Sequence, residues 1–322
     1  MQTFYYFCTR FMNVFGEKWT FTSFGESHGA AIGGVLDGVP AGLHIDFEMI
    51  RAELDRRAGR IKNVVSSGSE PGFNGVSSRA LHEPDEVEWL SGVLDGVTLG
   101  TPIAFLIRNT NARPEDYEAL KHTYRTGHAD KVYELKYGIR DWRGGGRASA
   151  RETAARVVAG CIAKKKLEQQ GISIRATLIQ VGTETNPDKF NEVITAYQKE
   201  GDSIGGIIEC RINGLKAGVG EPIFDKLQAH LAFAILSINA CKGFEYGTGF
   251  EGVTQPGSAI NAISGGIAGG ISDGTEVVFR CVFKPTPSTP KAGVKGRHDA
   301  CVATRAVPVV ETMTALALVQ LI

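Results

Sequence analysis

Residues 143–160 read RGGGRASARETAARVVAG and join a glycine turn to the start of a helix. Ser149 and Glu152 have the spacing of a capping box, in which each side chain binds the backbone N–H of the other residue. The Ala- and Val-rich run that follows predicts a helix that ends before Gly171. We therefore expect the capping box to open this helix.

Three arginines, Arg143, Arg147 and Arg151, surround the glycines of the same stretch. A helix N-terminus offers unpaired N–H groups and the positive end of the helix dipole, and each guanidinium adds two parallel donors. This combination predicts an anion site. The alternative is a glycine turn with solvated arginines.

The other predicted elements mix helices and strands without strict alternation. Asp46 can cap a helix that carries Phe47, Ile50 and Leu54 on one face and ends near Gly59. This order favours a layered α+β architecture over a doubly wound parallel sheet. Further helices are predicted over 224–238 and from Pro308 onward, and strands over 32–39, 103–108, 172–181, 204–212 and 276–283.

The composition excludes several classes of protein. Among 322 residues, Lys plus Arg and Asp plus Glu each number 35, so no global positive field exists to hold nucleic acid. No apolar run approaches the 18 residues of a membrane span. The six cysteines lack metal-ligand spacing, which predicts no metal site and favours reduced thiols in a cytosolic, cytoplasmic protein.

The first eleven residues form an atypical N-terminal extension, rich in aromatic side chains such as Phe4, Tyr5 and Tyr6. They lack the aliphatic run of a signal peptide and the Ser and Arg content of a transit peptide. Met12 begins what resembles a natural start. We therefore predict a single domain over residues 12–322.

Two glycine-rich stretches are predicted to be loops. Residues 66–78 carry turn chemistry throughout. Residues 247–252 match the G-x-G-x-x-G dinucleotide fingerprint as a string, but residues 253–257 after them carry no helix signal. Because the fingerprint needs a strand, a turn and a helix, we dismiss the match.

Three further polar clusters could carry chemistry. His28 and His128 each lie among small residues in a predicted tight turn, where an imidazole meets ligands and exchanges protons near neutral pH. His298 and Asp299 follow Lys295 and Arg297 in the third cluster, KGRHD. Taken singly, each cluster is equally well a polar turn or a surface charge run.

Together and in order, these clusters resemble chorismate synthases, from about Met12 to the C-terminus. Agreement over so many ordered blocks is far more specific than any one of them. The blocks are GESHG at 25–29, GHAD at 127–130, KYGIRD at 136–141, RGGGRASARET at 143–153, SINA at 237–240, GGIAGGIS at 265–272, KPT at 284–286 and GRHD at 296–299.

The resemblance implies a lyase that eliminates phosphate from 5-enolpyruvylshikimate 3-phosphate to give chorismate, the last common step of the shikimate pathway. The 1,4-anti elimination uses reduced FMN and has no net redox change. The implied fold is a layered β-α-β sandwich with antiparallel four-stranded sheets, assembled as a homotetramer. Whether NADPH serves as the source of electrons for the flavin stays open.

Roles carry over residue by residue. By resemblance, His28 lies near the leaving phosphate, His128 near the flavin pyrimidine edge, and Asp299 works with flavin N5 to remove the C6 proton. Arg57 and Arg60 match family positions that bind either the anionic groups of the substrate or NADP. Arg151 is a further cation for the substrate. The implied FMN contacts are Arg147, Ala148, Ser149, Asn239, Ala240, Gly269, Lys284, Pro285, Thr286, Pro287, Ser288 and Arg297.

The chain also departs from the family pattern. Ala148 replaces the usual Ser, and Thr126 and Ala300 stand where Pro is usual. Residues 61–82 form a longer segment without the Thr-x-Arg-Lys-Glu pattern, and the chain is short near 183–191, 261–264 and 287–295. These changes leave two rivals: a non-catalytic flavin- or anion-binding homologue, and, more remotely, a dinucleotide oxidoreductase.

Overall fold

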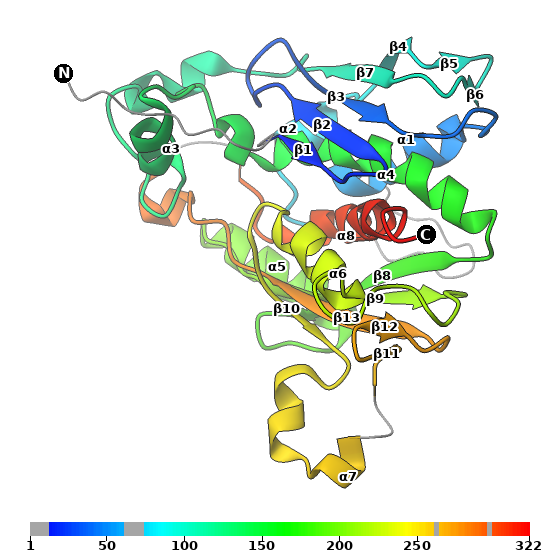
Figure 1. Cartoon of the computed structure of the whole chain (residues 1–322). Helices are drawn as coiled ribbons and strands as arrows, with labels where there is room; N and C mark the ends of the chain where they lie inside the picture. Colours follow the sequence, from blue (N-terminus) through cyan, green and yellow to red (C-terminus); the bar gives the residue numbers. More distant parts are fainter. Residues whose placement is uncertain (1–12, 61–73, 261–263, 295–297) are drawn as a thin grey trace.

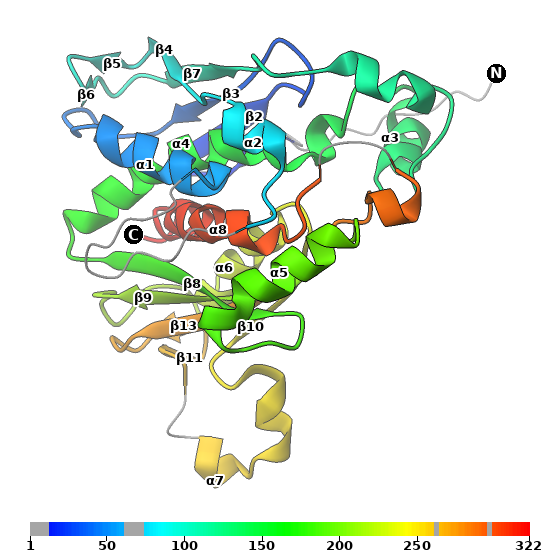
Figure 2. The ribbon, with the colours of Figure 1, turned by 180° about the vertical axis from the view of Figure 1, so that it is seen from behind.

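Three layers make up the molecule, with helices between two antiparallel sheets (Figures 1 and 2). The computed structural model describes residues 13–60, 74–260, 264–294 and 298–322. The layered α+β prediction is therefore confirmed. No helix among these described residues is long and apolar enough to cross a membrane.

The first sheet has the strand order β1-β2-β3-β7-β4, one strand more than expected, because a two-residue strand, β1, extends its edge. The predicted strands 32–39 and 103–108 form its centre, where Ile32 pairs with Ile107. The bounds are β1 Val14–Phe15, β2 Thr20–Phe24, β3 Ala31–Asp37, β7 Ile103–Arg108 and β4 Val87–Ser91.

The second sheet has four strands, as predicted, in the order β10-β13-β9-β8. Its three longer strands were all expected from the sequence, whereas β10 was missed. Two hairpins complete the strands. The bounds are β10 Cys241–Tyr246, β13 Val277–Phe283, β9 Gly206–Asn213 and β8 Ser173–Val181, with hairpins β5 Val93–Leu94 to β6 Val97–Thr98 and β11 Ile267–Ala268 to β12 Ile271–Ser272.

Helices α1 (Phe47–Ala58), α4 (Thr153–Glu168) and α8 (Ala303–Leu318) fill the middle layer. Every residue of α8 is buried, including the charged residues Arg305 and Glu311. The other helices are α2 Ser78–His82, α3 Asp130–Tyr137, α5 Phe190–Lys199, α6 Leu227–Leu236 and α7 Gly257–Ile260.

The caps of α1 are confirmed. The Asp46 side chain accepts a hydrogen bond from the Met49 N–H at 2.9 Å, and Gly59 ends the helix with φ 71°. Ile50 and Leu54 are buried, but Phe47 is exposed and packs its ring edge against Trp89 instead.

The start of α8 was predicted wrongly. The helix begins at Ala303, five residues before Pro308, which lies inside it. An internal proline removes one intrahelical hydrogen bond and normally disfavours a helix. Here helices α1, α4 and α6 and strands β8 and β9 bury the helix along its whole length, so tertiary packing outweighs that local cost.

The capping box ahead of α4 is only half formed. The Ser149 hydroxyl accepts from the Arg151 N–H, but Glu152 turns forward to pair with Arg156 at 3.0 Å. The chain therefore makes a 3₁₀ turn over Ala150–Glu152, and the α-helix starts at Thr153.

The loop predicted over 66–78 lies largely outside the described residues. Its final part is not a surface loop, because Ser77 is buried and Ser78 begins α2. Five cysteines, Cys161, Cys210, Cys241, Cys281 and Cys301, carry free thiols, and Cys8 lies outside the described part of the chain.

Gly160 marks the closest approach of α4 and α8. A Cβ at this position would overlap the Cβ and backbone of Thr312. Replacing Gly by Ala ordinarily stabilises an exposed helix by about 1 kcal/mol. We expect the opposite sign for Gly160→Ala, a loss of about 1–3 kcal/mol in the free energy of unfolding, because the helices must move apart. Urea denaturation measures this change.

Lys166→Ala is the matched control on the same helix, since Lys166 is only half-buried. Its free energy of unfolding should stay within about 0.5 kcal/mol of the parent value. Equal stability of the Gly160→Ala variant and the parent would contradict the close approach.

Candidate active site

A cavity of about 520 Å³ opens where loops from both sheets meet the N-terminal ends of α4 and α8. Its size suits a small-molecule ligand. Charged and titratable side chains dominate its wall. The sequence-predicted site residues that line it are His28, Arg57, His128, Ala148, Ser149, Arg151, Asn239, Ala240, Lys284, Thr286, Pro287, Ser288 and Asp299.

Four predicted site residues do not line this cavity, and Arg297 lies outside the described residues. Arg147 faces a second cavity, and Pro285 packs against Gly205. Arg60 pairs with Asp55 at 2.6 Å and donates to a backbone carbonyl. Gly269 lies in the turn between β11 and β12, away from the cavity.

His28 is buried, with 6% of its surface exposed, which corrects the expectation of an exposed turn histidine. The Ser27 hydroxyl lies 3.1 Å from Nδ1, and the Arg79 guanidinium lies 3.2–3.3 Å from both ring nitrogens. The Tyr117 ring meets the imidazole edge-on. These contacts fix the ring in the cavity wall.

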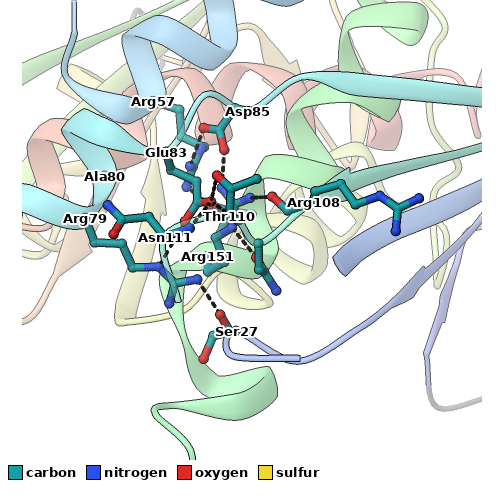
Figure 3. A network of polar contacts seen from close by, with 12 residues as sticks. Ser27, Arg57, Arg79, Ala80, Glu83, Asp85, Arg108, Thr110, Asn111 and Arg151 are labelled. Carbon is teal, nitrogen blue, oxygen red and sulfur yellow. Dashed lines mark hydrogen bonds and ion pairs between the residues drawn. The ribbon is translucent and has the colours of Figure 1, made fainter. Parts of the chain in front are cut away.

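The arginines of the wall are held by carboxylates (Figure 3). Asp85 accepts from Arg57 through Oδ2 at 3.0 Å and from Arg151 through Oδ1. Burial alone would raise the pKa of Asp85, but these two guanidinium charges outweigh it and lower the pKa to about 2. Both arginines are therefore held in position by an ion pair, a contact that the sequence analysis did not predict.

Asp299 is clamped from two sides. Its Oδ1 accepts the backbone N–H of Ser77 at 2.9 Å, and its Oδ2 accepts from Arg305 of α8 at 2.7 Å. Arg305 also donates to the Arg57 carbonyl at 2.9 Å. Sequence reasoning placed Asp299 beside Arg297 and missed Arg305, which is six residues away in the chain.

Other cavity residues also escaped the sequence analysis. Arg79 pairs with Glu83, which in turn accepts from the backbone of Thr110 and Asn111 (Figure 3). No motif marked these positions, because their neighbours in space are distant in the chain. The missed lining residues include Ser77, Arg79, Tyr117, Arg125, Lys242 and Arg305.

The buried polar atoms of the wall that have no hydrogen-bond partner among the described residues include Asn239 Oδ1, Ser288 Oγ and His298 Nε2. Burial lowers the pKa of His298, which favours its neutral ring. Buried polar groups are normally satisfied. These three atoms therefore point to a polar ligand in the cavity.

The arginine-rich turn at 143–151 divides between two cavities, which corrects the single anion site predicted there. Arg143 pairs with Asp141 at 2.8 Å, and Arg147 donates to Ser23 and to the Gly25 carbonyl. Nearby loops thus satisfy both guanidiniums. The second cavity, of about 990 Å³, shares His128, Ala129, Gly145 and Ala148 with the first.

The structure agrees that residues 247–252 are not a dinucleotide-binding fingerprint. Residues 247–252 follow β10 but lead into a 3₁₀ turn, Gly249–Thr254. Strand β10 pairs antiparallel with β13, so no βαβ unit surrounds the glycines.

Fold and cavity together define an enzyme-like α+β protein that gathers a small polar ligand among arginines, histidines and carboxylates. The chain belongs to the chorismate synthase family, whose sequence profile matches residues 19–322. The family predicted from the motifs is therefore confirmed. With it comes the lyase reaction that defines the family, the release of phosphate from 5-enolpyruvylshikimate 3-phosphate to form chorismate.

Relatives and a solved structure agree with this family. A chorismate synthase of Christiangramia forsetii is 46% identical over 95% of this chain and 96% of its own length, and one of Phocaeicola vulgatus is 44% identical over 96% and 97%. A crystal structure of chorismate synthase has a TM-score of 0.74 at 28% identity, covering 95% of this chain and 92% of its own.

The alignment with the Christiangramia relative spans 354 positions, more than the 322 residues of this chain. The relative therefore has residues that this chain lacks.

Gly144 determines the position of His28. Its φ is 76°, and a Cβ there would overlap the His28 imidazole and approach Ser27 Oγ. We expect Gly144→Ala to displace His28 and to lower chorismate formation by at least about 10-fold, the lower end of the scale for a general acid–base group. A chorismate assay with reduced FMN measures this loss.

Gly138→Ala is a matched control for the strain of a positive φ. Gly138 has φ 75°, and nothing lies within 4 Å of its added Cβ. This variant should keep parental turnover. Equal losses in the two variants would show that backbone strain, and not contact with His28, limits turnover.

Proposed function

We propose that the 520 Å³ cavity binds 5-enolpyruvylshikimate 3-phosphate and reduced FMN and catalyses the 1,4-anti elimination of phosphate. One observation carries the proposal: His28, His128 and Asp299 come from distant motifs and line a single cavity. A non-catalytic binding protein has no need of two titratable rings and a carboxylate gathered in this way.

The cavity wall fits a flavin. Its unpaired polar atoms on Asn239 and Ser288 suit the carbonyl and N–H groups of a flavin ring or the hydroxyls of its ribityl chain. When bound, reduced FMN supplies electron density that helps to expel phosphate and a basic ring nitrogen near the departing proton. The proposed FMN contacts on this wall are Ala148, Ser149, Asn239, Ala240, Lys284, Thr286, Pro287 and Ser288.

The substrate carries two carboxylates and one phosphate, although the protein has no net charge. We assign the phosphate to the region of His28 and Arg79, where a guanidinium already contacts the imidazole. An anion bound between His28 and Arg79 offsets the positive charge of the guanidinium, so that His28 can carry a proton beside it. His28 can then donate that proton to the leaving phosphate.

We assign the carboxylates of the substrate to the remaining cations of the cavity wall. Lys242 and Lys284 line the cavity without forming an ion pair among the described residues. Arg57 and Arg151 stay proposed substrate contacts, held in place by Asp85. Arg57 and Arg60 also remain the proposed NADP contacts, with NADPH as a source of electrons for FMN.

Asp299 is assigned to the proton that leaves C6 of the substrate. Arg305 engages Oδ2, whereas Oδ1 accepts only the Ser77 N–H among the described residues. A carboxylate oxygen has two lone pairs, so Oδ1 can take up the proton while both contacts persist.

Assembly into a homotetramer is part of the proposal. Gly269 lies away from the cavity of its own chain, so it can reach a flavin only in a neighbouring copy. Large apolar side chains also remain exposed, among them Phe224 at 89%, Phe250 at 83% and Val253 at 88%. Such exposure is typical of protein–protein contacts.

We assign a single domain to residues 12–322, which the family match from residue 19 supports. Residues 1–11, the atypical extension, lie outside the described part of the chain. A cytoplasmic location is supported by the free thiols of the five described cysteines.

The reaction should need reduced flavin but consume no reductant, because electrons return to the flavin in each turnover. Purified protein with reduced FMN and substrate should release phosphate and chorismate in equal amounts, without net oxidation of NADPH. Oxidation of one NADPH per chorismate would contradict the lyase proposal. Binding of both ligands without product would favour the non-catalytic homologue.

Asp299→Asn separates proton transfer from positioning. The variant keeps the size and hydrogen-bonding shape of the side chain but loses its basic oxygen, so turnover should fall about 10²- to 10⁴-fold while FMN and substrate still bind. Fluorescence titration of FMN and the chorismate assay measure the two effects. Weakened binding with unchanged maximal turnover would mean that Asp299 only orients Arg305.

A further inference from the structure

His128 has a defined partner that none of its assigned roles explains. Its Nδ1 lies 2.8 Å from Oδ1 of Asp130, two residues along the chain. Asp130 is the first residue of α3 and is only 5% exposed. A carboxylate can only accept here, so the ring must carry its hydrogen on Nδ1.

Asp130 stays ionised because Arg125 surrounds it. Arg125 donates Nε to Oδ2 and Nη2 to Oδ1, both at 2.8 Å, and its backbone N–H donates to Oδ2 at 3.1 Å. Burial raises the pKa of Asp130, but hydrogen bonds from Arg125 and His128 outweigh it and hold the pKa far below its ordinary range.

The arginine is fixed in turn. Arg125 Nη2 also donates to the Gly144 carbonyl at 2.9 Å, on the same glycine that packs against His28. The Arg125–Asp130 pair is thus a buried, neutral unit that presents one carboxylate oxygen to His128. The other ring nitrogen, Nε2, has no hydrogen-bond partner among the described residues, and His128 lines both cavities.

We propose that Asp130 is a positioning residue that locks His128 in the Nδ1–H form and thereby makes Nε2 the atom that exchanges protons with the bound ligands. A proton that arrives at Nε2 gives an imidazolium stabilised by the adjacent carboxylate, and it leaves from the same nitrogen. Asp130 itself never becomes protonated. This inference rests on the function proposed for the cavity.

The ring form can be read without ligands or turnover. Long-range ¹H–¹⁵N spectra of the ¹⁵N-histidine-labelled protein should give the Nδ1–H pattern for His128, assigned by the loss of its signals in His128→Gln. Asp130→Asn should move the ring toward the Nε2–H form that predominates in free imidazoles. An Nε2–H ring in the parent protein overturns the inference, even if the Asp130→Asn variant does not fold.

Turnover measurements also test whether Asp130 acts through His128. Asp130→Asn should lower kcat about 10- to 100-fold, the usual effect of losing a group that orients a functional histidine. In a His128→Gln background the same change should cost nothing further, because Asp130 acts only through that ring. Equal losses in both backgrounds would mean that Asp130 merely holds Arg125, and would overturn the proposal.

Lys131→Ala is the control on the same helix. Lys131 is exposed and forms no ion pair among the described residues, so its removal should leave the ring form and kcat unchanged. The two proposals fail separately. An inactive parent protein with an Nδ1–H ring contradicts the lyase function alone, whereas an active parent protein with an Nε2–H ring contradicts the role of Asp130 alone.

Discussion

The packing of α4 against α8 is the constraint on which the rest of the structure depends. Because Gly160 has no side chain, the backbone of α4 at this position lies directly against Thr312 of α8. One sheet lies on each side of the helical layer (Figure 1). Arg151 lies just before the first residue of α4, and Arg305 lies in the first turn of α8. Because the helix crossing is fixed, these guanidiniums meet at one cavity.

Charge in this cavity is arranged locally in a protein whose total is zero. Asp85, Glu83 and Asp130 each hold at least one arginine at the wall. Burying a lone guanidinium is costly, and a paired one is tolerated when its hydrogen bonds are satisfied. The carboxylates therefore do not prevent the arginines from binding anions. They fix cations at the positions that we propose for the phosphate and the two carboxylates of the substrate.

Corrections to the sequence-based predictions have one common cause. Pro308 lies inside a helix because other helices and the second sheet bury that helix on all sides. Glu152 does not complete the capping box because it forms an ion pair with Arg156. His28 is buried because Gly144 and Arg79 close over it. In each case a partner distant in sequence, or one turn further along, outweighs the local signal.

The sequence by itself determined the elements with strong local signals, such as the capped helix α1 and the apolar strands β7 and β8, because caps and alternation act over a few residues. Ordered motifs also determined the family and thirteen of the residues that line the cavity. Only the tertiary structure decided which arginines line the cavity and which carboxylates hold them. Asp85 meets Arg151 across 66 residues of chain, and no local spacing encodes a contact that the packing of helices and sheets creates.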